Sequence, residues 1–518
     1  MRTSILGLSA AAIAILIARP AAANGRFPAS NQIVFSPTND DIIVGRATYA
    51  ILPSTDNGKT WGYLCEDALA LPGAYSFQDP EIGVTFKNSI VAGLYSPTIG
   101  LDVSNDLGCN WNCVGGALAS QQIADIVVRP DGAPDGAATG TTSHQVLALT
   151  STFGSNIDAG ISSQVFESPD DGATWAALSP ALDPTVQFAT IDVAVSDPMR
   201  IYLSGNRNYA LARTGSLFVS MDNGTTWTEH PVPQFNMAIP CSDMPTTQCQ
   251  SEDSLYIAGV DPTDENIVYL RSDGPVGTNT PGNSNLYVTK DAGQTFQLVK
   301  SFALPPPNTD YLVSGEMLGF TLSADGSKVY IGTKETGLFA ASRADLTFTQ
   351  INSKVQVQCL ADRVLKSTGQ EELWACNTEL GGFVFGKSTD QGVSFTPMMA
   401  TITSLSGPIA CSPTGGMSAC LADANASTCS CSAYEQFCTV EPSACLGCGL
   451  DGGGGSPPAD DGGLSGGETD SSGDGGASKA PASQHASCGC SVVGGGSAAG
   501  FFAGWAIVAI AVRRRRAR

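Results

Sequence analysis

The sequence predicts an all-β fold made of seven consecutive units of four short strands. An eight-residue phrase, Ser/Thr-x-Asp-x-Gly-x-Thr/Ser/Asn-Trp/Phe, occurs six times, and a seventh, decayed copy aligns with the others without gaps. The copies begin at residues 54, 104, 168, 220, 289, 341 and 388. A period near 50 residues with four short strands per unit is typical of propeller blades. A second repeated phrase, a strand, an Asp- or Pro-containing turn and another strand, precedes several copies. These observations favour a seven-bladed β-propeller, with six blades as the alternative. The sequence leaves open whether residues 32–35 or residues 401–410 complete the last blade.

Each position of the repeated phrase suits a hairpin turn, as the copy at Ser220–Trp227 illustrates. The Asp222 carboxylate can accept hydrogen bonds from nearby backbone N–H groups, and Gly224 permits positive φ. The hydroxyls of the flanking Ser and Thr can bond within the same turn. Trp227 opens the next strand and is expected to pack against the neighbouring unit. The repeated Asp and aromatic positions are Asp56, Asp106, Asp170, Asp222, Asp291 and Asp390, with Trp61, Trp111, Trp175, Trp227, Phe296 and Phe395.

This phrase resembles the Asp-box of the sialidase-like, or BNR-repeat, β-propellers, and the resemblance covers most of the chain. In that family the box is a structural turn on the face away from the ligand, which implies a structural role for the six Asp residues. Sialidases of this fold also carry an arginine triad, a Tyr–Glu nucleophile pair, an Asp acid/base and an Arg-Ile-Pro motif. The nearest fragment here is Arg26-Phe27-Pro28, and no triad can be assembled from the Arg residues of the propeller. Sialidase chemistry is therefore not expected.

Composition narrows the ligand classes. The chain has 26 Lys and Arg against 48 Asp and Glu, a formal net charge of −22, which argues against nucleic acid because phosphate binding needs a basic face. Sixteen cysteines indicate an oxidising compartment. The three His residues are far apart, so neither a His-rich metal site nor a Ser–His triad is expected. We expect no cofactor and no metal.

The segments that flank the propeller predict secretion and anchoring. Residues 1–23 have the basic start, apolar core and small-residue cleavage site of a signal peptide, and the propeller is assigned to 24–405. A Cys-rich segment at 406–448 precedes a Gly/Ser/Asp-rich linker at 449–487, which has too few apolar residues to fold. Residues 488–518 contain Cys488-Gly489-Cys490, an apolar run long enough to cross a bilayer, and an Arg cluster that would stay cytoplasmic.

The three-part order of residues 488–518 resembles the myxobacterial C-terminal sorting signal (MYXO-CTERM). The resemblance implies processing at Cys488 and Cys490 by a sorting protease and display on the bacterial cell surface, at the outer membrane or envelope. An ordinary C-terminal membrane anchor is the alternative, and it leads to nearly the same topology. We expect a tethered monomer.

Two cysteine pairs in the propeller are disulfide candidates. Cys241 and Cys249 bracket a Pro-containing loop, and Cys359 and Cys376 lie on two adjacent predicted strands of the last unit. In the Cys-rich segment a disulfide knot is favoured over zinc, because only Cys445–Cys448 has C-x-x-C spacing and the segment has no His.

Alternation along a four-stranded meander predicts where a ligand would bind. The turns after the first and third strands share one side, so the repeated turns lie opposite the long loops of blades 4 to 6, and loops carry function more often than strands. Arg can hold an anionic or polyhydroxylated ligand in a bidentate manner, and Tyr can stack against it. The alternative is that each Arg pairs with local acids and orders its own loop. The candidate ligand-binding residues are Arg207, Tyr209, Arg213, Arg271, Asp273, Tyr311 and Glu316.

We therefore expect a secreted, surface-anchored and non-catalytic binding module for a glycan or protein ligand. A glycoside hydrolase of sialidase-like fold, without the arginine triad, is one alternative, because two carboxylates suffice for that chemistry. A structural surface protein is the other.

Overall fold

The computed structural model describes residues 30–405, except for segments 48–49, 65–79, 95–99, 120, 130–144, 154–159, 208–213, 236–237, 241–247, 251–253, 274–282, 305–316, 378–380 and 402–403. The predicted signal peptide, Cys-rich segment, linker and anchor, with Cys488 and Cys490, lie outside the described residues. Within the part described, no helix is long and apolar enough to span a bilayer.

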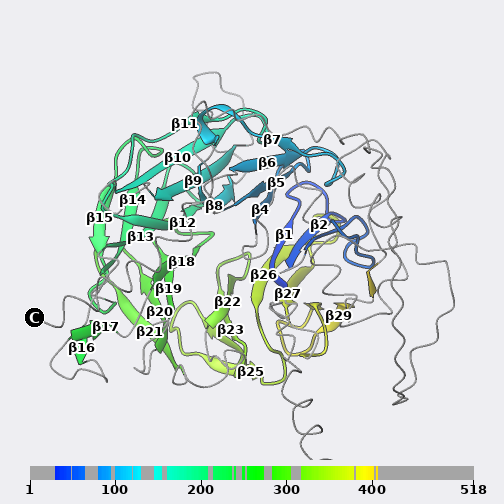
Figure 1. Cartoon of the computed structure of the whole chain (residues 1–518). Helices are drawn as coiled ribbons and strands as arrows, with labels where there is room; N and C mark the ends of the chain where they lie inside the picture. The colour runs from blue at the N-terminus through cyan, green and yellow to red at the C-terminus, as the bar shows by residue number, and fades with distance from the viewer. Residues whose placement is uncertain are drawn as a thin grey trace, which may run out of the picture. The chain divides into compact units, whose positions relative to one another are not determined.

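Seven antiparallel sheets follow one another along the chain and form the seven blades of a β-propeller (Figure 1). In each blade the strands lie side by side in sequence order. Blades 1 to 3 contain β1 (Ser30–Phe35), β2 (Ile43–Ala47) and β3 (Ala50–Ser54); β4 (Glu81–Val84), β5 (Ile90–Gly93), β6 (Leu101–Ser104) and β7 (Asn112–Cys113); and β8 (Ile123–Val128), β9 (Val146–Phe153), β10 (Ile161–Ser168) and β11 (Ala176–Ala177).

Blades 4 to 7 repeat this meander. They contain β12 (Gln187–Val193), β13 (Ile201–Arg207), β14 (Thr214–Ser220) and β15 (Thr228–Pro231); β18 (Ser254–Val260), β19 (Val268–Asp273), β20 (Asn283–Thr289) and β21 (Gln297–Ala303); β22 (Met317–Leu322), β23 (Lys328–Thr333), β24 (Gly337–Ser342) and β25 (Thr349–Asn352); and β26 (Cys359–Val364), β27 (Glu371–Cys376), β28 (Phe385–Ser388) and β29 (Thr396–Met399). A hairpin of β16 (Ala238–Pro240) and β17 (Gln248–Gln250) lies between blades 4 and 5, and a 3-10 turn at Gly116–Leu118 follows blade 2.

The fourth strand of blade 1 is reduced to a single bridge. Ile51 and Leu64 exchange backbone hydrogen bonds of 3.3 and 3.0 Å, and Gly62 N donates to Pro53 O at 2.8 Å. The chain therefore still runs along the outer edge of the third strand, and blade 1 keeps the four-stranded plan.

The ring closes without exchange of strands between the first and last blades. The first strands contact one another in the cyclic order β1, β4, β8, β12, β18, β22 and β26, and β26 returns to β1. Residues 32–35 thus belong to blade 1, and blade 7 is complete with β26–β29. The seam between these blades is made by packing, because the Trp61 and Phe385 rings stack at 4.6 Å and a Cβ on Gly45 would lie 2.2 Å from the Phe385 ring.

Polar contacts reinforce the seam, and a disulfide lies within blade 7. Ser30 Oγ lies 2.9 Å from the carbonyl oxygen of Asn377 and 2.8 Å from that of Val384. Cys359 and Cys376 face each other on β26 and β27 and form the predicted disulfide. The other predicted pair stays a prediction, because Cys241 lies outside the described residues.

Candidate functional site

The six repeated turns share one hydrogen-bond pattern, and all six Asp carboxylates are used inside their own turns. In the fourth copy, Asp222 Oδ1 accepts from Ser220 Oγ at 2.8 Å and from Thr226 N at 2.8 Å, and Asp222 Oδ2 accepts from Thr226 Oγ1 at 2.6 Å. Gly224 N donates to Ser220 Oγ at 2.7 Å, and Asn223 takes the left-handed conformation with φ 59°. The hydrogen bond from Thr226 is the largest influence that lowers the pKa of Asp222. The turns therefore behave as structural elements.

The turns after the first and third strands share one side of each blade, as the meander predicts. Asn223 N donates to Met199 O at 3.0 Å in blade 4, and Asn57 N donates to Asp41 O at 3.0 Å in blade 1. The four indole rings differ in burial, from Trp61 at 1 % and Trp111 at 9 % exposed to the half-buried Trp175 and Trp227. We call this side of the propeller the turn face.

Cations join neighbouring blades on the turn face, a role that sequence reasoning missed. At several boundaries between neighbouring blades, an Arg or Lys side chain of one blade contacts a side chain in the repeated turn of the next blade. The residue contacted is the one that directly follows the Asp of that turn. Arg363 Nη2 donates to Asn57 Oδ1 at 2.5 Å across the seam, and Lys87 Nζ lies 2.8 Å from Asp171 Oδ2. Burial lowers the pKa of the corresponding Arg129 in blade 3 to about 10. The contacts of this kind are Lys87–Asp171, Arg129–Asn223, Lys328–Gln391 and Arg363–Asn57.

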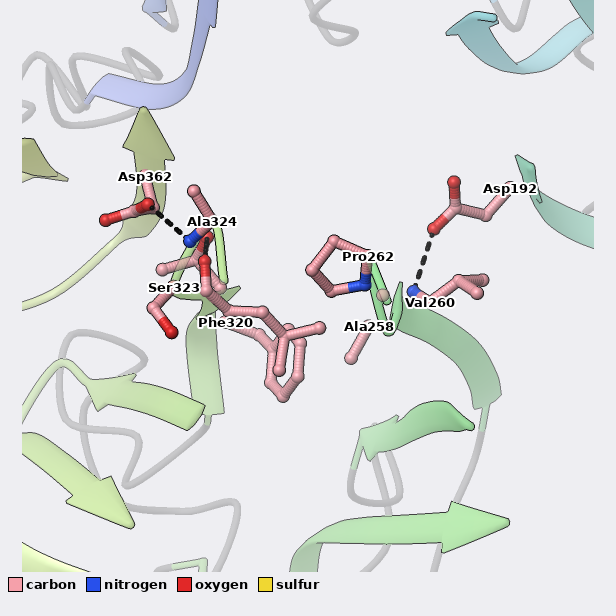
Figure 2. Close-up of a pocket in the computed structure, with 11 residues that line it drawn as sticks. Asp192, Ala258, Val260, Pro262, Phe320, Ser323, Ala324 and Asp362 are labelled. Atoms are coloured by element: carbon pink, nitrogen blue, oxygen red, sulfur yellow. Dashed lines mark hydrogen bonds between the residues drawn. The ribbon is translucent and has the colours of Figure 1, made fainter. Parts of the chain in front are cut away.

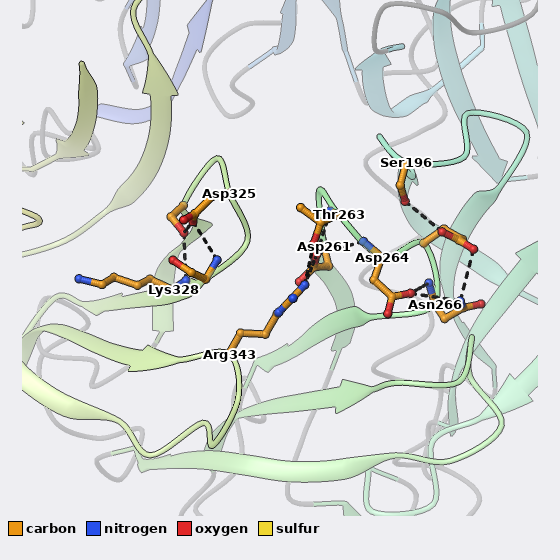
Figure 3. A network of polar contacts seen from close by, with 11 residues as sticks. Ser196, Asp261, Thr263, Asp264, Asn266, Asp325, Lys328 and Arg343 are labelled. Carbon is orange, nitrogen blue, oxygen red and sulfur yellow. Dashed lines mark hydrogen bonds and ion pairs between the residues drawn. The ribbon is translucent and has the colours of Figure 1, made fainter. Parts of the chain in front are cut away.

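In the decayed copy in blade 6, the cation belongs to the repeated turn itself and contacts the preceding blade (Figure 3). Arg343 stands where the other copies have Asp, and its Nη1 lies 2.8 Å from Asp261 Oδ1 and 2.7 Å from Thr263 Oγ1, both in blade 5. Asp261 is fully buried. The loss of the turn carboxylate thus accompanies a gain of an ion pair with the preceding blade.

The residues predicted to bind a ligand are only partly described. Arg207, at the end of β13, lies 2.8 Å from Asp183 Oδ2 and 2.6 Å from Glu229 Oε2. Arg271 on β19 donates to Met317 O at 3.2 Å and lies 4.9 Å from the centre of the Tyr256 ring. Asp273 ends β19, and the remaining candidates, Tyr209, Arg213, Tyr311 and Glu316, lie outside the described residues. This site stays a prediction.

The described residues enclose a different site, a cavity of about 240 Å³ between the inner strands (Figure 2). It is walled by parts of β18 and β22 and carries one carboxylate from β12, Asp192, and one from β26, Asp362. Pro262 and Ala324, which line it, belong to turns of the turn face, so the cavity lies toward that side. Neither Arg nor Lys is among its described lining residues.

Asp192 holds two inner strands together while it faces the cavity. Its Oδ1 accepts from Val193 N at 2.8 Å, and its Oδ2 accepts from Val260 N, in the next blade, at 3.2 Å. Asp125 does the same one blade earlier, because its Oδ2 accepts from Ile191 N at 2.9 Å. The first strand of each blade has one unpaired edge, and these carboxylates satisfy donors on it. Burial raises the pKa of Asp192 to about 6.

Asp362 belongs to two cavities. Its Oδ1 accepts from Ala324 N, in the turn of blade 6, at 3.1 Å. It also lines a second cavity of about 230 Å³ together with Tyr330, Glu371 and Gln391. Burial, followed by the negative charge of Glu371, raises the pKa of Asp362 to about 8.

The carboxyl groups of Asp192 and Asp362 therefore differ in protonation at neutral pH. Asp362 retains its proton, whereas Asp192 has largely lost its own. Environments that push the pKa values of two acids apart are those in which one acts as a proton donor and the other as a base. The described residues contain no group of three His, Cys, Asp or Glu side chains suited to a metal ion.

Comparison with known proteins gives similarity to solved structures alone. No protein-family model matches the chain, and no curated protein matches it. The resemblances to the Asp-box family and to the sorting signal therefore stay predictions. The solved structures include an ancestral GH74 enzyme, at 15 % identity with a TM-score of 0.46, covering 72 % of this chain and 46 % of that one. They also include the Penicillium chrysogenum alpha-L-arabinanase complexed with arabinobiose, at 12 % identity with a TM-score of 0.36, covering 57 % of this chain and 87 % of that one. The chain thus spans less than half the length of the GH74 enzyme, and we draw no conclusion on activity or substrate from these similarities.

Proposed function

We propose that this propeller is a glycoside hydrolase, with Asp362 as the proton donor and Asp192 as the base or nucleophile. The observation that carries the proposal is the pair itself: two carboxyls from different blades line one cavity, with pKa values of about 8 and about 6. Cleavage of a glycosidic bond needs one carboxyl that is protonated and one that is ionised.

The composition of the cavity wall fits an uncharged sugar. Apart from the two acids, the described lining consists of backbone, small side chains and apolar groups such as Phe320 and Pro262. A volume of about 240 Å³ lies just below the range of roughly 300–1,000 Å³ typical of small-molecule sites. By volume, a single sugar unit is the group that this open cavity would hold.

The test is hydrolysis by the full-length protein on a panel of neutral and acidic polysaccharides, measured as reducing ends between pH 5 and pH 9. Activity should be highest near pH 7, because Asp192 must be ionised and Asp362 protonated. Asp362→Asn and Asp192→Asn should each lower the rate by about 10²-fold or more. Glu335→Gln, an exposed acid in the turn after β23, is the matched control. Hydrolysis that both cavity variants retain at the wild-type rate would refute the assignment.

A second candidate function is non-catalytic recognition of a glycan or protein. It is favoured by the fact that Asp192 and Asp362 already accept backbone hydrogen bonds from neighbouring blades, as structural carboxylates do. If no glycan on the panel is cleaved but immobilised glycans or proteins retain the folded chain, this second function takes precedence.

The sequence of the two ends supports a proposal on location. We propose that the propeller is secreted and tethered at the cell surface through residues 488–518, which have the composition of a sorting or membrane segment. Deletion of residues 488–518 should release the propeller into the medium, and protease added to intact cells should digest it when the tail is present. Retention of the truncated chain on cells would contradict this proposal.

A further inference from the structure

We propose that Asp362 and Glu371 form a carboxyl pair that shares one proton, with Glu371 as the positioning residue that returns a proton to Asp362 from the outer cavity. The inference deepens the proposed function, on which its catalytic part rests. The existence of the pair can be tested without any substrate.

Strand register places the two side chains next to each other. On β26 and β27, Asp362 faces Leu373 and Val364 faces Glu371. Residues two apart on a strand share a face, so Asp362 and Glu371 are diagonal neighbours on one side of blade 7. After burial, the charge of Glu371 is the largest influence that raises the pKa of Asp362. Two neighbouring carboxyl groups can hydrogen-bond to each other only if one of them holds a proton.

The two cavities meet at Asp362. The inner cavity, of about 240 Å³, has Asp362 but not Glu371 in its wall, and the outer cavity, of about 230 Å³, has both. The outer cavity is completed by Tyr330 from blade 6 and Gln391 from the repeated turn of blade 7. Glu371 is half-buried. The pair therefore stands between the site of proposed chemistry and a cavity that begins at the turn face.

The charged groups around Asp362 favour retention of a proton. Glu371 on β27 and Asp325 in the turn after β22 raise its pKa through their charges, and Tyr330 on β23 faces it across the outer cavity. Asp192 lies across the inner cavity, and Lys328 is held by Gln391 at the outer one. Arg363 and Glu372 alternate to the other side of the ladder, where Arg363 donates to Asp40 O of blade 1 at 2.9 Å. Burial and the neighbouring negative charge of Glu371 therefore favour a proton on Asp362 at neutral pH.

The proton balance holds when Asp192 acts as the base. The O–H bond of Asp362 breaks as its proton moves to the leaving oxygen; the glycosidic C–O bond breaks, and a water molecule that gives its proton to Asp192 forms the new C–O bond. Asp192 releases that proton to solvent. A hydronium ion in the outer cavity gives a proton to a Glu371 oxygen and becomes water, and the proton then passes to Asp362, which restores the starting state.

The test is an infrared titration of the full-length protein, without substrate, between pH 4 and pH 10. A carbonyl band of a protonated carboxyl should persist at pH 7 and be absent in Asp362→Asn. In Glu371→Gln the amide keeps a hydrogen-bond partner but removes the charge, so the midpoint of that band should fall by about one pH unit or more. Asp325→Asn should lower the midpoint less, because the charge of Asp325 raises the pKa of Asp362 less than the charge of Glu371 does. Glu335→Gln, the matched loss of a distant charge, should leave it unchanged.

The outcomes separate this pair from the hydrolase assignment. If the midpoint falls in Glu371→Gln but no glycan is cleaved, the pair stands and the hydrolase assignment fails. If glycans are cleaved and the midpoint is the same in Glu371→Gln as in wild type, the pair is refuted. Where both hold, the alkaline limb of the rate profile should move to lower pH in Glu371→Gln. A rate profile of wild-type shape in that variant would also count against the pair.

Discussion

Replacement of Asp192 by Asn should change how the stability of the propeller depends on pH. The carboxyl of Asp192 is enclosed between blades 4 and 5, where it accepts hydrogen bonds from Val193 N and Val260 N. Burial disfavours the ionised form and raises the pKa from an ordinary value near 3.8 to about 6. The amide of Asp192→Asn keeps an acceptor oxygen for Val260 N but cannot ionise.

The magnitude follows from the difference between the two pKa values of Asp192. A shift of about two units, at about 1.4 kcal/mol per unit, corresponds to about 3 kcal/mol. Because the folded-state pKa is raised, this contribution to stability is fully present below the unfolded value near 3.8 and is lost as the pH rises through about 6. The wild-type protein should therefore lose about 3 kcal/mol between pH 4 and pH 7 that Asp192→Asn does not lose.

Urea unfolding at a series of pH values from 4 to 8 measures this difference. Asp222→Asn provides a contrast of opposite sign, because hydrogen bonds in the repeated turn lower the pKa of Asp222. Its contribution is present above the unfolded value and is lost as the pH falls through the folded one. If Asp192→Asn and wild type keep a constant difference in free energy of unfolding over the whole series, then Asp192 does not carry a raised pKa and the argument for its role as base is wrong.

Three further variants test the ring. Trp61→Ala should cost about 3–5 kcal/mol by urea unfolding, because this ring is 1 % exposed and sits at the seam; a wild-type midpoint would contradict the packing. Arg363→Met should destabilise by about 1–3 kcal/mol, since Glu372 would lose the 2.8 Å contact to Arg363 but keep Lys387 at 2.9 Å; a loss well below about 1 kcal/mol would argue against this pairing. Cys359→Ser combined with Cys376→Ser should cost about 2–4 kcal/mol, and reductant should then no longer change the melting temperature, whereas it should lower that of wild type.

The fold could be predicted from the sequence because its signal is local. In each repeated turn the Asp carboxylate and the Ser or Thr hydroxyl bond within the same turn, as Asp222 does with Ser220 and Thr226, so their chemistry can be read without knowledge of distant residues. The decayed copy departs from this pattern, because its left-handed residue is Leu346, with φ 53°, two positions later than Asn223 in the fourth copy. The count of seven blades over six is supported by the complete four-stranded sheet of blade 6, β22–β25.

Ring closure could not be predicted, because it depends on contacts between the two ends of the domain. Gly45 leaves room for the Phe385 ring, although more than 300 residues separate them, and neither residue belongs to a repeated phrase. The candidate site was missed for a related reason. Asp192 and Asp362 are two of 48 acidic residues, and only burial and neighbouring charges distinguish them. The one sequence signal for Asp192 and Asp362 is that each lies within the predicted first strand of a unit. The unpaired edge of such a strand has backbone N–H groups that need a hydrogen-bond acceptor.

The rare cations illustrate how the same observation can support two interpretations. In a chain of net charge −22, Arg residues on adjacent loops are reasonable ligand-binding candidates. Among the described residues, however, Lys87, Arg129, Arg343 and Arg363 link one blade to the next. A ring closed without shared strands gains from such links, because each joins two blades that no backbone hydrogen-bond ladder connects. The described lining of the inner cavity then has carboxylates as its only charged groups, and burial together with neighbouring charge raises their pKa values.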